Sequence, residues 1–446
     1  MGHHAYTLQE QQRLDRNREA MISLVRGDGR PQRLGNERTL GIELERLILD
    51  PVSGQRVPFE GPLSISTLLA RWERFFAPEC ALIIDNTLFG YEGIVTVENK
   101  EVGISITLEP GAQLEVAVGP SNSVSDLLGA ILAFDEQYAQ LCQDLGVEWQ
   151  LVALGTDPFT IDPREVALIP KERYRLMDKT LSHTGRYARD MMRCSASTQI
   201  SLDCSDEQNM VAEYRLAVAL GPLLAFLCDN VISWRGLSVG DTPRMVRARI
   251  WDHMDPARCG IVPGTFDEGF GAEAYVQWLM GVCPILFTDD SGLTIPTCSA
   301  TEADIMAMRE LSQGELFHLL SMVFPTVRLK GFLEIRTPDS MPPQLAAALA
   351  AFIKGIFYND NAFAKASELF RDVTAKNVMD AQTELEEHGW DAKLYGLPCT
   401  TLVMRLVQLA ENGLQDQEER NIFHAISSLW LSHMVPKDLY KEQFVI

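Results

Sequence analysis

The sequence lacks the features that tie a chain to nucleic acid, a membrane or a disulfide-linked secreted fold. Acidic residues outnumber basic ones 61 to 39, a formal net charge of −22, which argues against nucleic acid or an anionic membrane as the main partner. The nine cysteines form no CxxC or CxxH pair, so we expect reduced thiols and a cytoplasmic protein. The polar beginning, "MGHHAYTLQEQQRLDRNREAM", does not resemble a secretory signal.

Several common nucleotide and nucleophile motifs are also absent. There is no G-x-x-x-x-G-K-[ST] and no G-x-G-x-x-G after a strand, so a P-loop, a Rossmann site and a protein kinase are unsupported, and no G-x-S-x-G is present. The longest apolar stretch, around residues 216–228, contains Gly221 and Pro222. Because it falls short of the roughly 20 residues of a membrane span, we expect it to be a buried helix.

The hydrophobic pattern predicts an α+β fold over the 446 residues. Helices are predicted at 7–26, 64–76, 123–145 and 206–234, and through most of the chain after Pro342. Strands are predicted at 40–49, in pieces over 80–101, on both sides of a turn at Pro110 and Gly111, and at 147–158, 198–205, 246–252 and 327–338. Strands that come singly between long helices favour one antiparallel or mixed sheet with helices mainly behind it.

We expect a single domain, because no low-complexity tract, obvious repeat or clear linker divides the chain. It would comprise an N-terminal helical segment (1–36), a sheet-forming core (37–340) and a mostly helical C-terminal part (341–446).

Five glutamates lie in or beside strands that are otherwise apolar. Glu43 and Glu45 point the same way because side chains alternate with period two. Glu109 precedes the turn and Glu115 lies in the strand after it. Three other predicted strands each carry polar side chains on one face. The last strand carries Arg328, Lys330, Glu334 and Arg336 there, with Phe332 among them. The strand at 246–252 carries Arg247 and Arg249, and the strand at 198–205, with the residue before it, carries Ser197, Gln199 and Ser201. A solvated face with cross-strand ion pairs would explain any one pair. Such a face is normally rich in threonine, lysine and serine.

A chemical surface explains the whole set better. Clustered carboxylates raise each other's pKa values unless a cation neutralises them. Oxygen ligands without paired histidine or cysteine suit Mg²⁺ or Mn²⁺ rather than zinc. Arginines beside such a cluster would hold phosphate or carboxylate groups. Together these groups predict phosphoryl transfer.

Seven motifs occur in the order seen in glutamate–cysteine ligases. They are "GIELE", "LEPGAQLEVAVGP", "IPKERYRLM", "STQISLD", "IWDHMDPARCG", "FDEGFGAEAYV" and "FPTVRLKGFLEIRTPD". The chain resembles the group that contains the plant enzymes and many bacterial relatives over residues 38–360, with a weaker likeness in "LAENGL". The resemblance implies a glutamine synthetase-like fold, in which a strongly curved antiparallel sheet carries the active site on its concave face.

The resemblance also implies a reaction. ATP would phosphorylate the γ-carboxylate of L-glutamate, and the amino group of L-cysteine would then attack to give γ-glutamylcysteine, ADP and phosphate, the first step of glutathione synthesis. Two or three Mg²⁺ ions, or Mn²⁺, would assist. The alternatives are a ligase with another acceptor amine, a guanidino phosphotransferase, and a catalytically inactive binding relative. The acceptor amine and the oligomeric state stay open at this point.

Residue roles follow from the same resemblance. The metal ligands would be Glu43, Glu45, Glu109, Glu115 and Glu334, with Gln199 as a metal or nucleotide contact. Arg336 would contact the transferred phosphate, and Arg247 would be the second catalytic arginine. Substrate or nucleotide contacts would come from Arg249, Arg258, Lys171, Arg173 and Tyr174.

Overall fold

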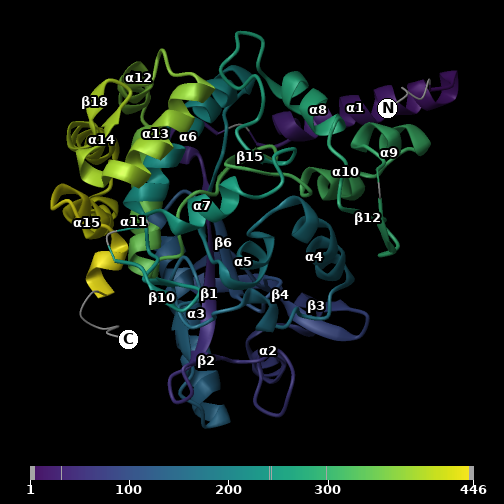
Figure 1. Ribbon diagram of the computed structural model, residues 1–446, viewed down its shortest axis with the longest axis vertical. Helices are drawn as coiled ribbons and strands as arrows, with labels where there is room; N and C mark the ends of the chain where they lie inside the picture. Colours follow the sequence, from purple (N-terminus) through teal and green to yellow (C-terminus); the bar gives the residue numbers. More distant parts are fainter. Residues whose placement is uncertain (1–5, 32, 241, 243, 298, 441–446) are drawn as a thin grey trace.

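A ten-stranded sheet forms the centre of the computed structural model, which describes residues 6–31, 33–240, 242, 244–297 and 299–440 (Figure 1). Its strands are β1 (Leu40–Asp50), β2 (Gln55–Arg56), β3 (Ala81–Ile84), β4 (Thr87–Val97), β5 (Lys100–Leu108), β6 (Leu114–Ser121), β7 (Gln150–Val152), β8 (Thr198–Leu202), β15 (Val327–Leu329) and β16 (Leu333–Ile335). The order is β15-β16-β8-β1-β6-β5-β4-β3, with β2 and β7 also paired to β1, and every pairing is antiparallel.

Helices make up most of the rest. They are α1 (Leu8–Arg26), α2 (Ile65–Trp72), α3 (Val124–Leu145), α4 (Glu172–Thr184), α5 (Ala188–Cys194), α6 (Glu207–Leu227), α7 (Val246–Asp252), α8 (Ala272–Met280), α9 (Glu302–Met308), α10 (Gln313–Leu320), α11 (Pro343–Phe357), α12 (Asp360–Leu369), α13 (Ala375–His388), α14 (Cys399–Gly413) and α15 (Gln417–Leu431). Four small strand pairs lie outside the main sheet: β9 (Ser233–Trp234) with β10 (Leu237–Ser238), β11 (Cys259–Gly260) with β14 (Phe324–Pro325), β12 (Leu286–Thr288) with β13 (Thr294–Pro296), and β17 (Lys393–Leu394) with β18 (Leu397–Pro398).

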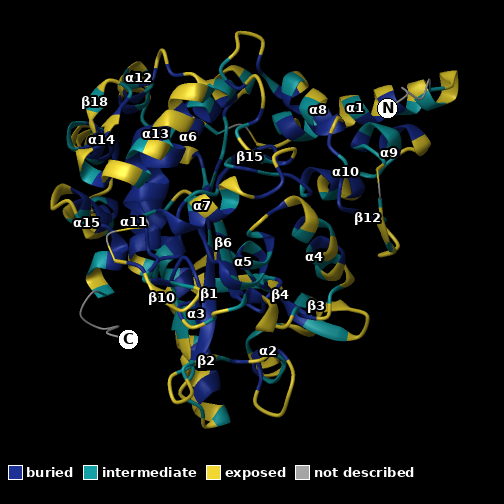
Figure 2. Cartoon of the chain, in the orientation of Figure 1, coloured by how far each residue is buried: buried dark blue, intermediate teal, exposed yellow. Residues whose placement is uncertain are grey.

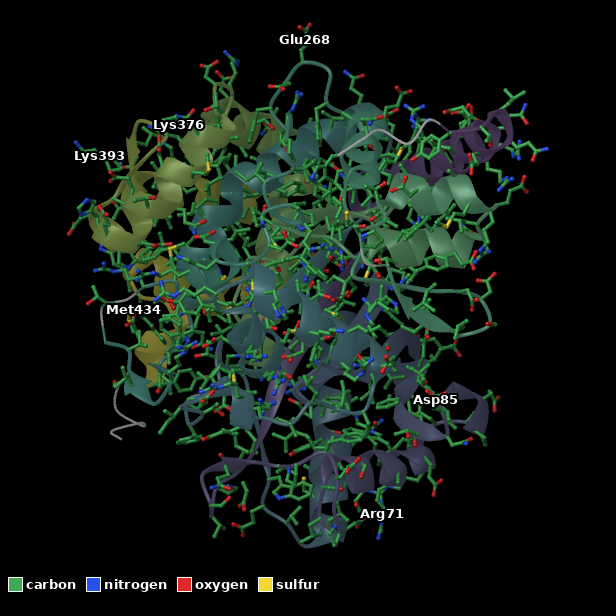
Figure 3. The ribbon with its side chains drawn as sticks, turned by 45° about the vertical axis from the view of Figure 1, so that its right-hand side comes forward. Arg71, Asp85, Glu268, Lys376, Lys393 and Met434 are labelled. Atoms are coloured by element: carbon green, nitrogen blue, oxygen red, sulfur yellow. The ribbon has the colours of Figure 1, made fainter. Side chains whose placement is uncertain are left out.

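The apolar alternates of β1 explain which face of the sheet is covered. Ile42 and Leu44 are fully buried, and α3 and α11 pack against the strand. The α11 helix is buried over nearly its whole length and is dark blue in Figure 2. Charged side chains such as Arg71, Asp85 and Lys376 instead project from the periphery (Figure 3). The glutamates of β1 face away from α3 and α11, toward the side bordered by α4, α5 and α7.

Many predicted elements are confirmed, as is the α+β class with an antiparallel sheet. The strand predicted at 40–49 is β1, and the turn at Pro110 and Gly111 joins β5 to β6. The helix predicted at 7–26 is α1, whose capping box is formed by Thr7 and Glu10. The helix expected from 123 is α3, capped by the Ser123 hydroxyl.

The strand predicted at 246–252 is wrong, because these residues form α7. A segment of seven residues with alternating arginines fits either a short strand or two helical turns. Contacts with other parts of the chain determine which of the two forms. The helix begins where the backbone N–H of Met245 donates to the buried carboxylate of Asp229 at 3.0 Å. Arg247 and Arg249 therefore do not share a face, as a strand would have required.

Three other boundaries also differ from the prediction. The segment 327–338 is a hairpin of β15 and β16 rather than one strand, and it turns at Gly331, which has a φ of +74°. The helix predicted at 206–234 ends at Leu227, before Asp229 and Asn230, whose side chains bond to neighbouring segments. The strand expected over 147–158 shortens to β7.

The predicted apolar helix is α6. Among the described residues it is the one helix long and apolar enough to cross a membrane, and 83% of its most apolar window is buried inside the protein.

Candidate active site

The glutamates of β1 lie on a polar surface shared by three strands. Glu43 is opposite Gln199 of β8, and Glu45 is opposite Glu115 of β6. Directly paired residues of antiparallel strands project to the same face of a sheet. The polar alternates predicted from separate parts of the sequence therefore meet on one face.

This face forms one wall of a cavity of about 400 Å³. The predicted residues that line it are Glu43, Glu45, Glu109, Glu115, Gln199, Lys171, Arg173, Tyr174, Arg247 and Arg336. The structure thus brings most of the predicted site together. It leaves out Glu334, which is buried just behind the wall, and Arg249 and Arg258, which lie elsewhere.

Three carboxylates in the cavity are repelled by neighbouring carboxylates, and the cations near Glu43 and Glu109 offset this repulsion only in part. Burial, and then the neighbouring Glu45, raises the pKa of Glu109 to about 7. Burial, and then Glu43, raises the pKa of Glu115 well above its ordinary value. Burial, and then Glu334, raises the pKa of Glu43. Raised pKa values are expected of clustered carboxylates, and a bound cation would lower them.

Glu45 differs from these three because it is fully hydrogen-bonded. Its carboxylate accepts from the backbone N–H and the hydroxyl of Ser197, at 2.7 and 2.8 Å, and from the Gln199 amide at 3.0 Å. The oxygen of the Gln199 amide accepts from Arg336 at 2.6 Å. Gln199 therefore links a carboxylate of β1 to the arginine that follows β16.

Glu334 anchors cations rather than facing the cavity. Its carboxylate pairs with Arg328 at 2.7 Å, Lys330 at 2.5 Å and Arg336 at 2.9 Å. Burial acts to raise the pKa of Glu334, but the three cations hold it well below its usual range. In this geometry Glu334 fixes the direction of Arg336, and its predicted role as a metal ligand stays a prediction.

Three other predicted arginines, on α7 and in the loop after it, behave differently from one another. Arg247 is buried and donates to the carbonyl oxygens of residues 336, 337 and 338 at 3.1–3.3 Å, so it braces the backbone that carries Arg336. Arg249, two residues along α7, points outward and lies 3.6 Å from Glu386. Arg258 pairs with Asp255 and bonds to the carbonyl oxygens of Met322 and Cys283. The structure does not bring Arg249 or Arg258 into the cavity.

Residues at the start of α4 form the opposite wall. The Lys171 ammonium lies 4.6 Å from the Phe89 ring centre, and burial lowers the pKa of this lysine. The Tyr174 hydroxyl donates to the carbonyl oxygen of Leu108, beside Glu109. Arg173 also lines the cavity, and its removal from water lowers its pKa. The cavity is thus lined by carboxylates of the sheet and by cations from the start of α4, from α7 and from the segment after β16.

Comparison with known proteins identifies the family. The profile described as Glutamate-cysteine ligase family 2 matches residues 39–418. The chain belongs to this family. The chloroplastic glutamate–cysteine ligase of Medicago truncatula is 26% identical over 362 residues, which cover 79% of this chain and 70% of the relative. The chloroplastic glutamate–cysteine ligase B of Oryza sativa subsp. japonica is 28% identical over 340 residues, or 73% and 67% of the two chains.

Two solved structures match the chain more distantly. The crystal structure of the ligase PafA with the prokaryotic ubiquitin-like protein Pup has a TM-score of 0.38 and 10% identity, covering 89% of this chain and 64% of that one. Apo GmaS has a TM-score of 0.31 and 13% identity, covering 96% and 74%.

The carboxylates of this family member suit a hard divalent ion. Glu43, Glu109 and Glu115 offer oxygen ligands, and none of them forms an ion pair with a described lysine or arginine. Within the described residues, however, no three acidic, histidine or cysteine side chains are close enough to hold one ion by themselves. Mg²⁺ typically binds through one or two carboxylates together with substrate phosphates, which agrees with both observations.

Several functional positions were not singled out from the sequence. Thr107 lies opposite Glu115 and donates to it at 2.6 Å, and strand alternation alone could have placed it there. Arg328 and Ser197 were placed on the polar face without a role. Met191 and Met192 of α5 line the cavity from a segment that carries no strand pattern, so no sequence signal pointed to them. Trp251 lines it from the segment that was predicted as a strand and is α7, and it was given no role.

Proposed function

We propose that this ligase-family member joins the γ-carboxylate of L-glutamate to the amino group of L-cysteine, using ATP and passing through γ-glutamyl phosphate. The observation that carries the proposal is the cavity itself, in which carboxylates with raised pKa values, none of them in an ion pair among the described residues, share the lining with Arg336. Phosphoryl transfer needs charge neutralisation and alignment rather than a strong base. The cavity offers both.

Each group of residues in the cavity has a separate role in the proposed reaction. Two or three bound Mg²⁺ ions would neutralise charge on the ATP phosphates, and Glu43, Glu45, Glu109 and Glu115 would hold these ions with no more than one or two carboxylates to each. Arg336, fixed by Glu334 and Gln199, neutralises the phosphoryl group as it moves. Arg247 keeps the Arg336 backbone in place through its carbonyl contacts. The half-buried cations of the α4 wall, Lys171 and Arg173, suit carboxylate or phosphate groups.

The acceptor amine has a separate space beside the same arginines. A second cavity of about 210 Å³ shares Arg247, Arg336, Trp251 and Phe324 with the first. Its remaining lining is largely apolar and includes Cys259. These walls favour a small amino acid with a soft or apolar side chain, which supports L-cysteine as the acceptor.

The proposal includes a reducing, cytoplasmic setting and small-molecule partners only. The eight cysteines that the structure describes are all free thiols, which supports a reducing compartment.

The test is ADP release from ATP, Mg²⁺ and L-glutamate while the amine is varied, with the product mass measured. We expect ADP and γ-glutamylcysteine with L-cysteine, and loss of both in the Arg336→Gln variant. ADP release with another amine but not with L-cysteine would indicate a related ligase. No ADP with any amine would overturn the proposal in favour of an inactive relative, and phosphorylation of a guanidino compound would indicate a phosphotransferase.

A further inference from the structure

A second charged cavity of about 450 Å³ lies beside the same short helix that borders the candidate active site. Met191 and Met192 of α5 line the candidate active site, whereas Arg189 and Asp190 line this other cavity. Its charged walls are Arg164, Arg186, Arg189 and Arg235 together with Asp162 and Asp190. We call these six residues the arginine groove. The family profile spans them but none has a place in the proposed reaction.

Both aspartates of the groove are already neutralised. Asp190 is buried and receives two parallel hydrogen bonds of 2.7 Å from Arg235, with a third of 3.1 Å from the Trp234 indole. Asp162 accepts from Arg164 at 2.9 Å, and this contact lowers the pKa of Asp162 to about 2. Two of the four arginines are therefore paired with a carboxylate inside the groove.

The other two arginines have no such partner. Arg186 is exposed, lies over the Tyr187 ring at 5.1 Å and forms no ion pair with a carboxylate of the described residues. Arg189 reaches Asp178 only at 3.3 Å, and that carboxylate also accepts a shorter bond of 2.8 Å from Arg193. The groove thus has a surplus of two positive charges, although the chain as a whole carries −22.

The arginines that line the groove suit one kind of ligand. Arg186 precedes α5, Arg189 lies on α5 and Arg235 comes from the turn between β9 and β10. A guanidinium group donates two parallel hydrogen bonds to carboxylate or phosphate oxygens, and a phosphate dianion offers more acceptor oxygens and more charge to two such groups than one carboxylate does.

We propose that the arginine groove binds a small molecule carrying a phosphate dianion. The inference goes beyond the proposed function and does not depend on it, since the groove contains no residue of the ligase cavity. Because α5 separates the two cavities, a ligand in the groove contacts the helix that presents Met191 and Met192 to the active site.

The experiment is protection of arginines from phenylglyoxal in the full-length protein, mapped by peptide mass spectrometry in about 0.15 M salt. The probes are inorganic phosphate, glycerol phosphate and succinate. We expect phosphate or its ester to protect Arg186 and Arg189 several-fold while Arg175, an exposed arginine of α4, is unprotected. Position-specific mapping separates this effect from phosphate bound near Arg336.

A double variant of Arg186 and Arg189 provides the second part of the experiment. Arg186→Gln combined with Arg189→Gln should raise the phosphate concentration that half-protects Arg164 by about a hundredfold, roughly tenfold for each charged donor lost. Arg175→Gln should leave that concentration unchanged. Greater protection by the ester than by phosphate would identify a phosphorylated metabolite, and equal protection would identify free phosphate. Equal protection by succinate, protection of Arg175, or none at Arg186 would overturn the proposal.

Discussion

Glu43 and Glu45 share a face of β1 but differ in what holds them. Glu43 belongs to the repelling cluster, and burial and Glu334 raise its pKa. Glu43→Gln should therefore leave the unfolding free energy of the metal-free protein unchanged or raise it by up to about 1 kcal/mol. Turnover should fall by more than roughly 100-fold, since even residues behind metal ligands are worth about 10–100-fold. Urea unfolding and ADP release check the two effects.

Glu45→Gln should instead affect both properties. Its carboxylate accepts two hydrogen bonds from Ser197 and one from Gln199, so an amide would turn its own N–H groups toward these donors. We expect a loss of about 1–3 kcal/mol in unfolding free energy as well as a loss of turnover. Equal stability of the two variants would contradict this distinction and favour a simple repelling pair.

The carboxylate cluster also sets a pH dependence for the metal-free protein. The pKa of Glu109 is about 7 in the folded chain, whereas an unfolded glutamate titrates near 4.5. Between these values the folded state binds more protons, so stability should fall as pH rises from 5 to 8. For Glu109 alone the full change is roughly 3 kcal/mol.

Urea midpoints at pH 5, 6, 7 and 8 without divalent ions test the sign. Glu109→Gln should flatten the dependence, and Mg²⁺ with ATP should restore stability at pH 8. A midpoint that rises with pH in the metal-free protein would mean that carboxylates with lowered pKa values, such as Glu334, dominate instead.

At the scale of elements, α7 provides two arginines with opposite expectations. Arg247 is buried against three carbonyl oxygens, whereas Arg249 is half exposed and 3.6 Å from Glu386. Arg247→Gln should cost about 2–4 kcal/mol of stability and reduce turnover through the displaced Arg336 backbone. Arg249→Gln should change stability by less than about 0.5 kcal/mol. Similar losses in both variants would show that α7 itself, rather than the buried contact, is needed.

A comparison of β1 with α7 shows where a sequence pattern is enough to predict the secondary structure. In β1 the alternation of buried Ile42 and Leu44 with Glu43 and Glu45 is long enough to specify both the strand and its face. In α7 the pattern covers seven residues, and the deciding contact comes from Asp229, 16 residues away. Periodicity could therefore predict the polar face of the sheet. The helices that line the rest of the cavity are positioned by tertiary contacts, which no local sequence pattern contains.

At the scale of the whole molecule, the site depends on contacts between distant segments. A single hydrogen-bond chain runs from Glu45 through Gln199 to Arg336 and Glu334, and a strand order of β16-β8-β1 is needed to form it. Alternation predicts which side chains share a face, whereas register decides which of them touch. The order of the motifs along the chain was enough to identify the residues of the site. Which of these residues bond to one another could be known only from the folded structure.

The C-terminal segment extends this dependence beyond residues 39–418, the span that the family profile matches. The Lys437 ammonium donates to the buried carboxylate of Asp229 at 2.8 Å, and the same oxygen accepts from the backbone N–H that starts α7. Both side chains of the pair are less than one tenth exposed. The C-terminal segment therefore helps to hold the helix that carries Arg247.

Lys437→Met should leave Asp229 as a buried, unpaired charge at the start of α7. Removing one partner of a buried pair costs about 3–5 kcal/mol, so the urea midpoint should fall clearly. Because α7 is loosened, turnover at saturating substrate should also fall in the fraction that stays folded. Lys393→Met, at the exposed lysine labelled in Figure 3, is the matched control and should shift stability by less than about 0.5 kcal/mol. If Lys437→Met is as stable and active as the control, the segment after residue 418 does not support the active site.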